Sequence, residues 1–363
     1  QVFENMKRRR FFYLPVKEDV MFQSDTHLPQ LLAPVHYSDP GLLEREVQKL
    51  MMPAWHCVGN IDDLSQGKEC YRFELFGKMY EIDGARRSIR MAATPSQSRS
   101  DRLYFSGRVQ VVGKLVFVSL SNAGQSLREF LGTHYDYIRD LFGGQWQRFL
   151  VAPQIVKANW KGLVENILES YHLEEVHKNT FRTFPSADVC FHDLHDSWSG
   201  YTERNESEHS HLRGGVATIS RLLKVNPHPE YRHIIIYPNC VIARMGLFNW
   251  IQTILPITPV QSMNYWQFFF LRGEKKNPVA WATSELLKNW GRRFFMKALE
   301  EDNQVLEGVQ AGLQSVSHPK GGLISAREER IFHFQRHAAE QTGVVPVTYA
   351  TGRDSAMKWS GTC

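Results

Sequence analysis

The chain of 363 residues lacks the features that define several large classes of protein. No apolar run approaches the ~20 residues that a membrane-spanning helix requires, and no signal-peptide core opens the chain. Its five cysteines show no paired spacing, which argues against a disulfide framework and fits a reducing compartment. We therefore expect a soluble, cytoplasmic protein.

The sequence also lacks a strong excess of charge of one sign. Lys and Arg number 43 and Asp and Glu 38, so the net charge of +5 is too small to indicate nucleic-acid binding. The basic run Lys7-Arg8-Arg9-Arg10 is interpreted as part of a solvated arm, and we expect neither a nucleic-acid nor a membrane partner. Because the chain begins at Gln1, two interpretations stay open: a fragment, or a true start at Met6.

The spacing of apolar residues predicts the elements of the first half of the chain. In chain order these are an irregular arm over 1–40, a helix over 41–52, strands over 71–75 and 114–120 joined by a polar loop over 86–108, a helix over 125–142 and a strand over 153–157.

In the second half, a polar stretch over 188–215 carries His192, His195, His209 and His211. It is interpreted as an exposed insertion, because these histidines repeat no known metal-ligand spacing. Four β-rich runs then predict an antiparallel sheet, over 216–224, 231–244, 248–257 and 261–272.

A long helical pattern over 281–316 follows the sheet. Its expected apolar face consists of Leu286, Leu287, Trp290, Phe294, Phe295, Leu299, Leu306, Val309 and Leu313. We expect an α+β layout in which this helix and one near 160–177 pack on the sheet between them.

The segment Asn159–His177 carries the strongest chemical signal in the sequence. It places His172 and His177 five residues apart on an amphipathic helical stretch. On an ideal helix this spacing points the two rings about 140° apart, so both can bind one metal only if the helix ends or distorts between them. Two His and one carboxylate form the facial ligand set of non-haem Fe(II), which leaves positions open for O₂ and substrate.

Three further features support such a site. Asp302, in the acidic stretch 300–307, is a carboxylate that can complete the ligand set from a second element. Asn166 and Glu169 are placed to hydrogen-bond the imidazole N–H groups that do not face the metal. Strand aromatics can wall a dry pocket, although we interpret them as plain core: Phe248, Trp250, Trp266, Phe268 and Phe270.

These residues resemble the mononuclear-iron motif of Rieske-type non-haem iron oxygenases, the aromatic ring-hydroxylating oxygenase α (catalytic) subunits. The resemblance lies in Asn-Trp-Lys at 159–161, Glu165-Asn166, an acidic residue three before His172, and His-x₄-His. Residues 302–307 have the Asp-Asn-x-x-x-Glu form of the family's third ligand.

The resemblance implies roles for individual residues and a layout for the chain. His172, His177 and Asp302 would be iron ligands, with Asn166 beside them and Glu169 as the bridging carboxylate of the electron path. Trp55-His56-Cys57-Val58-Gly59, with Leu64, looks like the entry into the family's N-terminal domain, and 113–120 like its exit.

The implied fold class is α+β, with a helix-grip-like (START/SRPBCC-type) catalytic domain that has an antiparallel sheet and a long C-terminal helix. A reduced, β-rich, Rieske-like domain would precede it. The expected organisation is an arm over 1–40, a cluster-less Rieske-like domain over 41–150, the mononuclear-iron domain over 151–345 and a tail over 346–363.

The family's [2Fe–2S] signature is missing. That cluster is bound by two Cys and two His, which appear as Cys-x-His and, after a gap, Cys-x₂-His. Neither half occurs between Trp55 and Leu120. Cys190-Phe191-His192 follows the iron motif without a second half and is interpreted as coincidence. We expect no Rieske cluster on this chain.

The expected function is O₂-dependent oxygenation of a small organic substrate at mononuclear Fe(II), by ring hydroxylation, dihydroxylation or oxidative demethylation. Electrons would come from a Rieske centre on a partner chain, fed by NAD(P)H through a reductase, within a homo- or hetero-trimer. Two alternatives stay open: a non-catalytic oxygenase-derived subunit for assembly or ligand binding, and a damaged gene that has lost its cluster loops. The aromatic content suits an aromatic ring or a quaternary ammonium group equally.

Overall fold

The computed structural model describes residues 27–64, 70–83, 88–91, 107–169, 172–178, 180–181, 190–203, 210–274, 276–315, 322–325 and 328–346. The basic run at 7–10, His209 and the tail beyond residue 346 lie outside the described residues. None of the described helices is long and apolar enough to cross a membrane.

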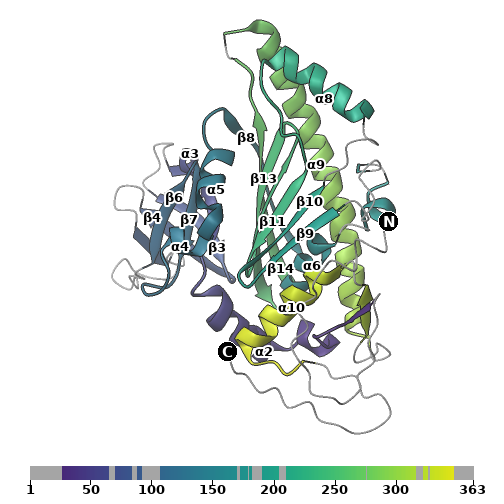
Figure 1. The fold of residues 1–363 in the computed structure, drawn as a ribbon. Helices are drawn as coiled ribbons and strands as arrows, with labels where there is room; N and C mark the ends of the chain where they lie inside the picture. The colour runs from purple at the N-terminus through teal and green to yellow at the C-terminus, as the bar shows by residue number, and fades with distance from the viewer. Residues whose placement is uncertain are drawn as a thin grey trace.

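A seven-stranded antiparallel sheet forms the centre of the molecule, in the order β8-β14-β13-β12-β11-β10-β9 (Figure 1). Strands β9 to β14 follow one another as a meander, and β8 pairs with β14 at one edge. The strands are β8 (Trp146–Val156), β9 (Cys190–His195), β10 (Trp198–Glu203), β11 (Arg232–Ile236), β12 (Cys240–Met245), β13 (Phe248–Thr258) and β14 (Gln261–Leu271).

Helices cover one face of this sheet. They are α6 (Trp160–Leu168), α7 (His172–Val176), α9 (Pro278–Leu313) and α10 (Glu329–Thr342), and α8 (Ser210–Leu223) lies beside α9. Side chains alternate across β11 as strand geometry requires. Ile235 packs with Trp160 and Phe334 of the helices, whereas Ile234 belongs to the core that contains Phe142.

The other face carries the β-rich N-terminal part of the chain (Figure 1). Two three-stranded sheets form it: β2 (His56–Asn60), β6 (Arg108–Val112) and β7 (Leu115–Ser119) in one, and β3 (Cys70–Leu75), β4 (Lys78–Asp83) and β5 (Ser88–Met91) in the other. Their shared core includes Val58, Phe73 and Val116 and extends to Leu255 of β13. The N-terminal sheets therefore pack directly on the central sheet.

Short elements complete the chain. They are β1 (His27–Pro29), which pairs with β15 (Leu323–Ser325), a 3₁₀ turn (Pro34–Tyr37), α2 (Pro40–Glu46), a π-helical turn (Val47–Met51), α3 (Ile61–Leu64), α4 (Leu127–Leu131), a 3₁₀ turn (Gly132–His134) and α5 (Tyr135–Leu141). Residues 27–40, expected in the arm, bury Leu32 and Tyr37.

The α+β prediction is confirmed, and three local predictions are wrong. The run 216–224 lies in helix α8 and its end, because Val216, Ile219 and Leu223 have helical rather than strand spacing. In the polar stretch 188–215, residues 190–203 form strands β9 and β10 of the central sheet, and 210–215 begin α8. The loop expected over 86–108 contains strand β5.

The apolar face expected for 281–316 also needs correction. Leu287, Phe295, Leu299 and Leu306 are buried, but Leu286, Trp290 and Val309 point outward, and Leu286 is 72 % exposed. Fewer residues of α9 are buried than the apolar residues of the sequence suggested, because only one side of this helix faces the sheet.

Candidate metal centre

A break in the helix places the two histidines of the motif. Helix α6 ends at Leu168, Glu169 has an extended backbone conformation, and α7 begins at His172. His177 directly follows the last residue of α7, and the two imidazole centroids are 5.4 Å apart. The distortion that the five-residue spacing requires is therefore present.

Buried contacts anchor α6 and explain Asn-Trp-Lys at 159–161. Asn159 caps the helix by accepting a hydrogen bond from the main-chain N–H of Lys161 at 3.0 Å. The fully buried Lys161 ammonium pairs with Glu46 at 2.7 Å, and the indole N–H of Trp160 donates to the same carboxylate at 2.7 Å. These residues fix the helix that leads into the histidines.

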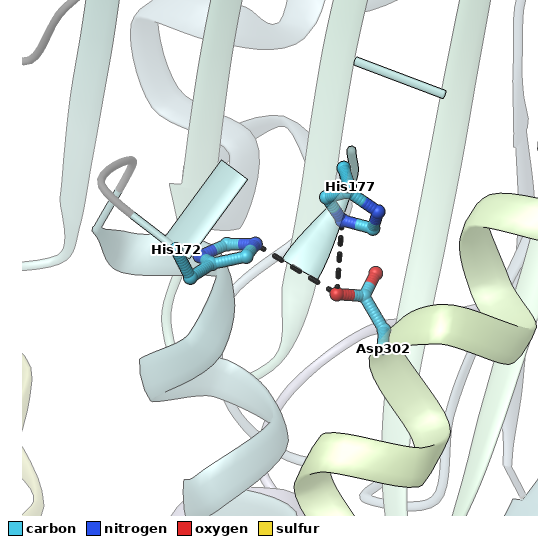
Figure 2. A group of neighbouring side chains, drawn as sticks. All are labelled: His172, His177 and Asp302. Carbon is cyan, nitrogen blue, oxygen red and sulfur yellow. Dashed lines mark ion pairs between the residues drawn. The ribbon is translucent and has the colours of Figure 1, made fainter. Parts of the chain in front are cut away.

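Asp302 of α9 completes a group of three candidate ligands (Figure 2). Its Oδ1 lies 3.1 Å from Nε2 of His177 and 3.7 Å from Nε2 of His172. One potential ligand atom from each residue lies within 4.8 Å of the other two. Two imidazole nitrogens and a carboxylate oxygen in this arrangement fit a divalent transition metal such as Fe(II).

The second nitrogen of each imidazole is held by another carboxylate. Nδ1 of His172 contacts Glu169, which also accepts the main-chain N–H of His172 at 3.1 Å. Nδ1 of His177 lies 2.9 Å from Glu301 Oε2, to which the Thr180 hydroxyl donates at 2.7 Å. Such contacts hold the proton on Nδ1 and direct the Nε2 lone pair toward a metal.

Negative charge is concentrated around the histidines. Burial lowers the pKa of His177, but the hydrogen bonds and charges of Asp302 and Glu301 outweigh burial, so the pKa is raised above its usual value of 6.5. The site therefore has the electrostatic character of a cation site.

Two outcomes differ from the sequence prediction. Asn166 donates from Nδ2 to Asp302 Oδ1 at 3.2 Å instead of bonding an imidazole, so it orients the carboxylate of the group. Glu301 was not among the predicted site residues. Its position next to Asp302 in an acidic run was the one feature of the sequence that could have indicated a role. Its contact with His177 could not be predicted, because the two residues are 124 positions apart in the sequence.

An aromatic cavity opens beside the three candidate ligands. Its sheet wall includes Phe268, Trp250, His233 and Tyr201, which belong to one cross-strand row that passes through Ala243. Trp266 stacks on Phe268 at 5.5 Å, and Phe295 of α9 stacks on Phe268 at 4.4 Å. Of the five strand aromatics interpreted as core, Trp250, Trp266 and Phe268 line this cavity and the other two are simply buried.

The residues of the N-terminal sheets do not fit a Rieske cluster. Between Trp55 and Leu120 the sequence has one His and two Cys, whereas the cluster needs two of each. Burial raises the pKa of Cys57 to about 12, and its sulfur lies 3.3 Å from the Gln267 amide. The buried ring of His56 contacts the Met51 carbonyl at 2.8 Å. Cys57 and His56 are therefore buried structural residues of β2, and Cys57 contacts the central sheet through Gln267.

Residues 125–343 match the family model "Ring hydroxylating alpha subunit (catalytic domain)". The α subunit of 2-aminobenzenesulfonate 2,3-dioxygenase from Alcaligenes sp is 23 % identical over 260 residues, which cover 67 % of this chain and 55 % of that protein. The oxygenase subunit of glycine betaine monooxygenase from Chromohalobacter salexigens is 23 % identical over 256 residues, which cover 61 % and 56 %. The chain thus spans about half the length of these curated relatives.

Solved structures share the fold. A quaternary ammonium Rieske monooxygenase superposes with a TM-score of 0.65 at 16 % identity, covering 86 % of this chain and 95 % of that one. The family match extends over more than half of the sequence and includes the segments that carry all three candidate ligands. The chain belongs to the family of ring-hydroxylating oxygenase α subunits.

Proposed function

We propose that this chain is an oxygenase that holds Fe(II) through His172, His177 and Asp302 and oxygenates a small organic substrate in the adjoining cavity. The observation that carries the proposal is the convergence of three ligand atoms beside an aromatic cavity, with both outer imidazole nitrogens already engaged by carboxylates. Bound iron would supply the activation of O₂ and a template for the substrate.

The protein's own residues position the reactants. Glu169 and Glu301 contact Nδ1 of the two imidazoles and leave Nε2 directed inward, and Asn166 holds the Asp302 carboxylate. The aromatic wall offers flat apolar surfaces that suit a planar ring or a quaternary ammonium group. The relatives named above act on an aromatic sulfonate and on glycine betaine, so both ring dihydroxylation and oxidative demethylation are candidate reactions.

We infer that the electrons come from a Rieske centre on a partner chain, supplied by NAD(P)H through a reductase in a trimeric assembly. Glu169 supports this inference, because its carboxylate contacts a candidate iron ligand at the position where the resemblance implies a bridging carboxylate, although the sequence shows no cluster-ligand pattern. Residues 41–150 would be the cluster-less Rieske-like domain and 151–345 the iron domain, between the arm 1–40 and the tail 346–363.

Iron binding is the first test. The purified chain, loaded with Fe(II) under nitrogen, should hold about one iron, and His172→Ala, His177→Ala or Asp302→Ala should each empty the site. His192→Asn is the matched control, because His192 forms a similar contact of 2.8 Å with Glu329 outside the cavity. Full iron retention in the three ligand variants would refute the assignment.

Turnover is the second test. Wild-type protein mixed with a Rieske-bearing ferredoxin or oxygenase, a reductase and NADH should couple O₂ consumption to product formation. The absence of cluster ligands favours one second candidate, a non-catalytic subunit kept for assembly or ligand binding. A chain that folds but binds no iron would support that candidate over the oxygenase.

A further inference from the structure

His233 is a buried side chain in the cavity wall whose outer nitrogen lacks a partner. It lies on β11, paired across the sheet with Tyr201 and Ala243, and is 4 % exposed. Its Nε2 has no hydrogen-bond partner among the described residues, and the side chain lines the cavity. A buried polar nitrogen left unpaired costs free energy, so a partner brought by a ligand would be favoured.

The contact that Nδ1 of His233 makes determines which ring nitrogen carries the proton. Nδ1 lies 3.5 Å from NH1 of Arg330 on α10. A guanidinium only donates hydrogen bonds, so Nδ1 must accept and the ring proton must sit on Nε2. Burial and the charge of Arg330 lower the pKa of His233 well below its usual value, which keeps the ring neutral. His233 therefore offers a fixed N–H donor.

Arg330 places a buried positive charge behind this donor. It is 1 % exposed, and its other hydrogen bonds go to the hydroxyl and carbonyl oxygens of Ser199 at 3.2 and 3.4 Å. Burial lowers the pKa of Arg330 to about 10, so the guanidinium remains charged at neutral pH. The ion pairs of the described part of the chain do not include Arg330, so its charge is available to polarise the His233 ring toward the cavity.

We propose that the substrate carries an anionic oxygen group, a carboxylate or sulfonate, whose oxygen accepts the Nε2–H of His233 with Arg330 behind it. The apolar remainder would lie along the wall of Trp250 and Phe268 toward His172 and His177. This inference deepens the proposed function and rests on it for the reaction, but the binding itself requires no turnover. A plain hydrocarbon would leave the donor buried and unpaired.

The test compares benzoate with nitrobenzene, which has nearly the same shape and no net charge. Binding to the full-length chain, with and without Fe(II) under nitrogen, is measured by titration calorimetry. Benzoate should bind wild type at least about tenfold more tightly than nitrobenzene, as expected for one charge-assisted hydrogen bond. His233→Phe should remove this preference, and His233→Gln, which keeps an N–H donor, should restore part of it.

Two matched controls separate the alternatives. His228→Phe removes another histidine with an unpartnered Nε2, stacked on Trp146 outside the cavity, and should change neither affinity. Trp266→Phe removes another N–H of the cavity wall that has no partner among the described residues, and it should leave the benzoate preference intact. Unchanged nitrobenzene affinity in the His233 and His228 variants would show that the cavity is still formed.

The inference is overturned if wild type binds both probes equally, if His233→Phe keeps the preference, or if the preference is lost only in Trp266→Phe. It is also overturned if the preference exists only with iron and disappears in His172→Ala, because benzoate would then be a metal ligand. A chain that binds no iron yet prefers benzoate through His233 would refute the proposed function while supporting this subsite.

Discussion

Replacing Glu301 by Gln should weaken Fe(II) binding without disturbing the fold. Glu301 Oε2 lies 2.9 Å from Nδ1 of His177 and accepts the Thr180 hydroxyl at 2.7 Å, so it holds the ring at the angle that directs Nε2 toward Asp302. The amide keeps the shape of the side chain but removes its charge, which makes His177 a poorer ligand.

The magnitude follows from the role of such a carboxylate. Loss of a group that orients a metal-bound imidazole costs 10- to 100-fold in metal affinity, or about 1.4–2.8 kcal/mol. Thr180→Val removes only one hydrogen bond to Glu301, so its effect on affinity should be smaller than that of Glu301→Gln. Glu301→Ala should lose at least as much as Glu301→Gln, because it also frees the His177 ring.

The assay is an anaerobic Fe(II) titration against a competing chelator, with thermal unfolding of the metal-free protein as the folding check. Glu300→Gln is the matched control, since Glu300 precedes Glu301 on α9 but is exposed and lines a separate groove with Gln154. Equal affinities for wild type and Glu301→Gln, or an equal loss in Glu300→Gln, would refute the orienting role.

Three further predictions concern the electron path and the anchoring of α6. At Fe(II) concentrations that saturate its site, Glu169→Gln should hold iron yet abolish turnover driven by a Rieske partner. Full turnover, measured as coupled O₂ consumption, would exclude the bridging role. Lys161→Met should lower the free energy of unfolding by about 3–5 kcal/mol, because it leaves Glu46 buried without its cation. Denaturant unfolding measures this loss. Adding Glu46→Gln to the Lys161→Met protein should recover part of the lost stability. Burial raises the pKa of Glu165 to about 7 from 4.5, so the folded protein binds the proton more tightly and stability should fall as pH rises across that window. Glu165→Gln should flatten this decline in unfolding experiments at several pH values, and an unchanged slope would contradict the assignment to Glu165.

The sequence carried enough information for the chemistry of the site because that chemistry is local. On an ideal helix His172 and His177 would point about 140° apart, so a shared metal site required an interruption of the helix. Helix α6 ends at Leu168 and α7 begins at His172. Strand alternation likewise predicted β3, and compact β-prone runs predicted β7, β13 and β14. Each of these features depends on residues that are close together in the chain.

Features that depend on long-range packing could not be predicted in the same way. The contact between Glu301 and His177 exists only because α9 returns across the sheet to α7, and His233 meets Arg330 across 97 residues. The run 216–224 contains β-branched residues that favour a strand, but burial of the helically spaced Val216, Ile219 and Leu223 against the neighbouring core outweighs that preference. Local preference is a weak guide where tertiary contacts decide.

The charges at the site weigh against a purely structural role for this chain. Glu169, Glu301 and Asp302 bring three carboxylates around two imidazoles in side chains that are at most 20 % exposed. Like charges gathered in partial burial repel one another and lose hydration, which is costly unless a cation compensates them. A subunit kept only for assembly would gain stability by losing one of these carboxylates. Their presence therefore supports metal binding, and the missing cluster-ligand pattern of residues 55–120 is the reason for our proposal that the electron store lies on another chain.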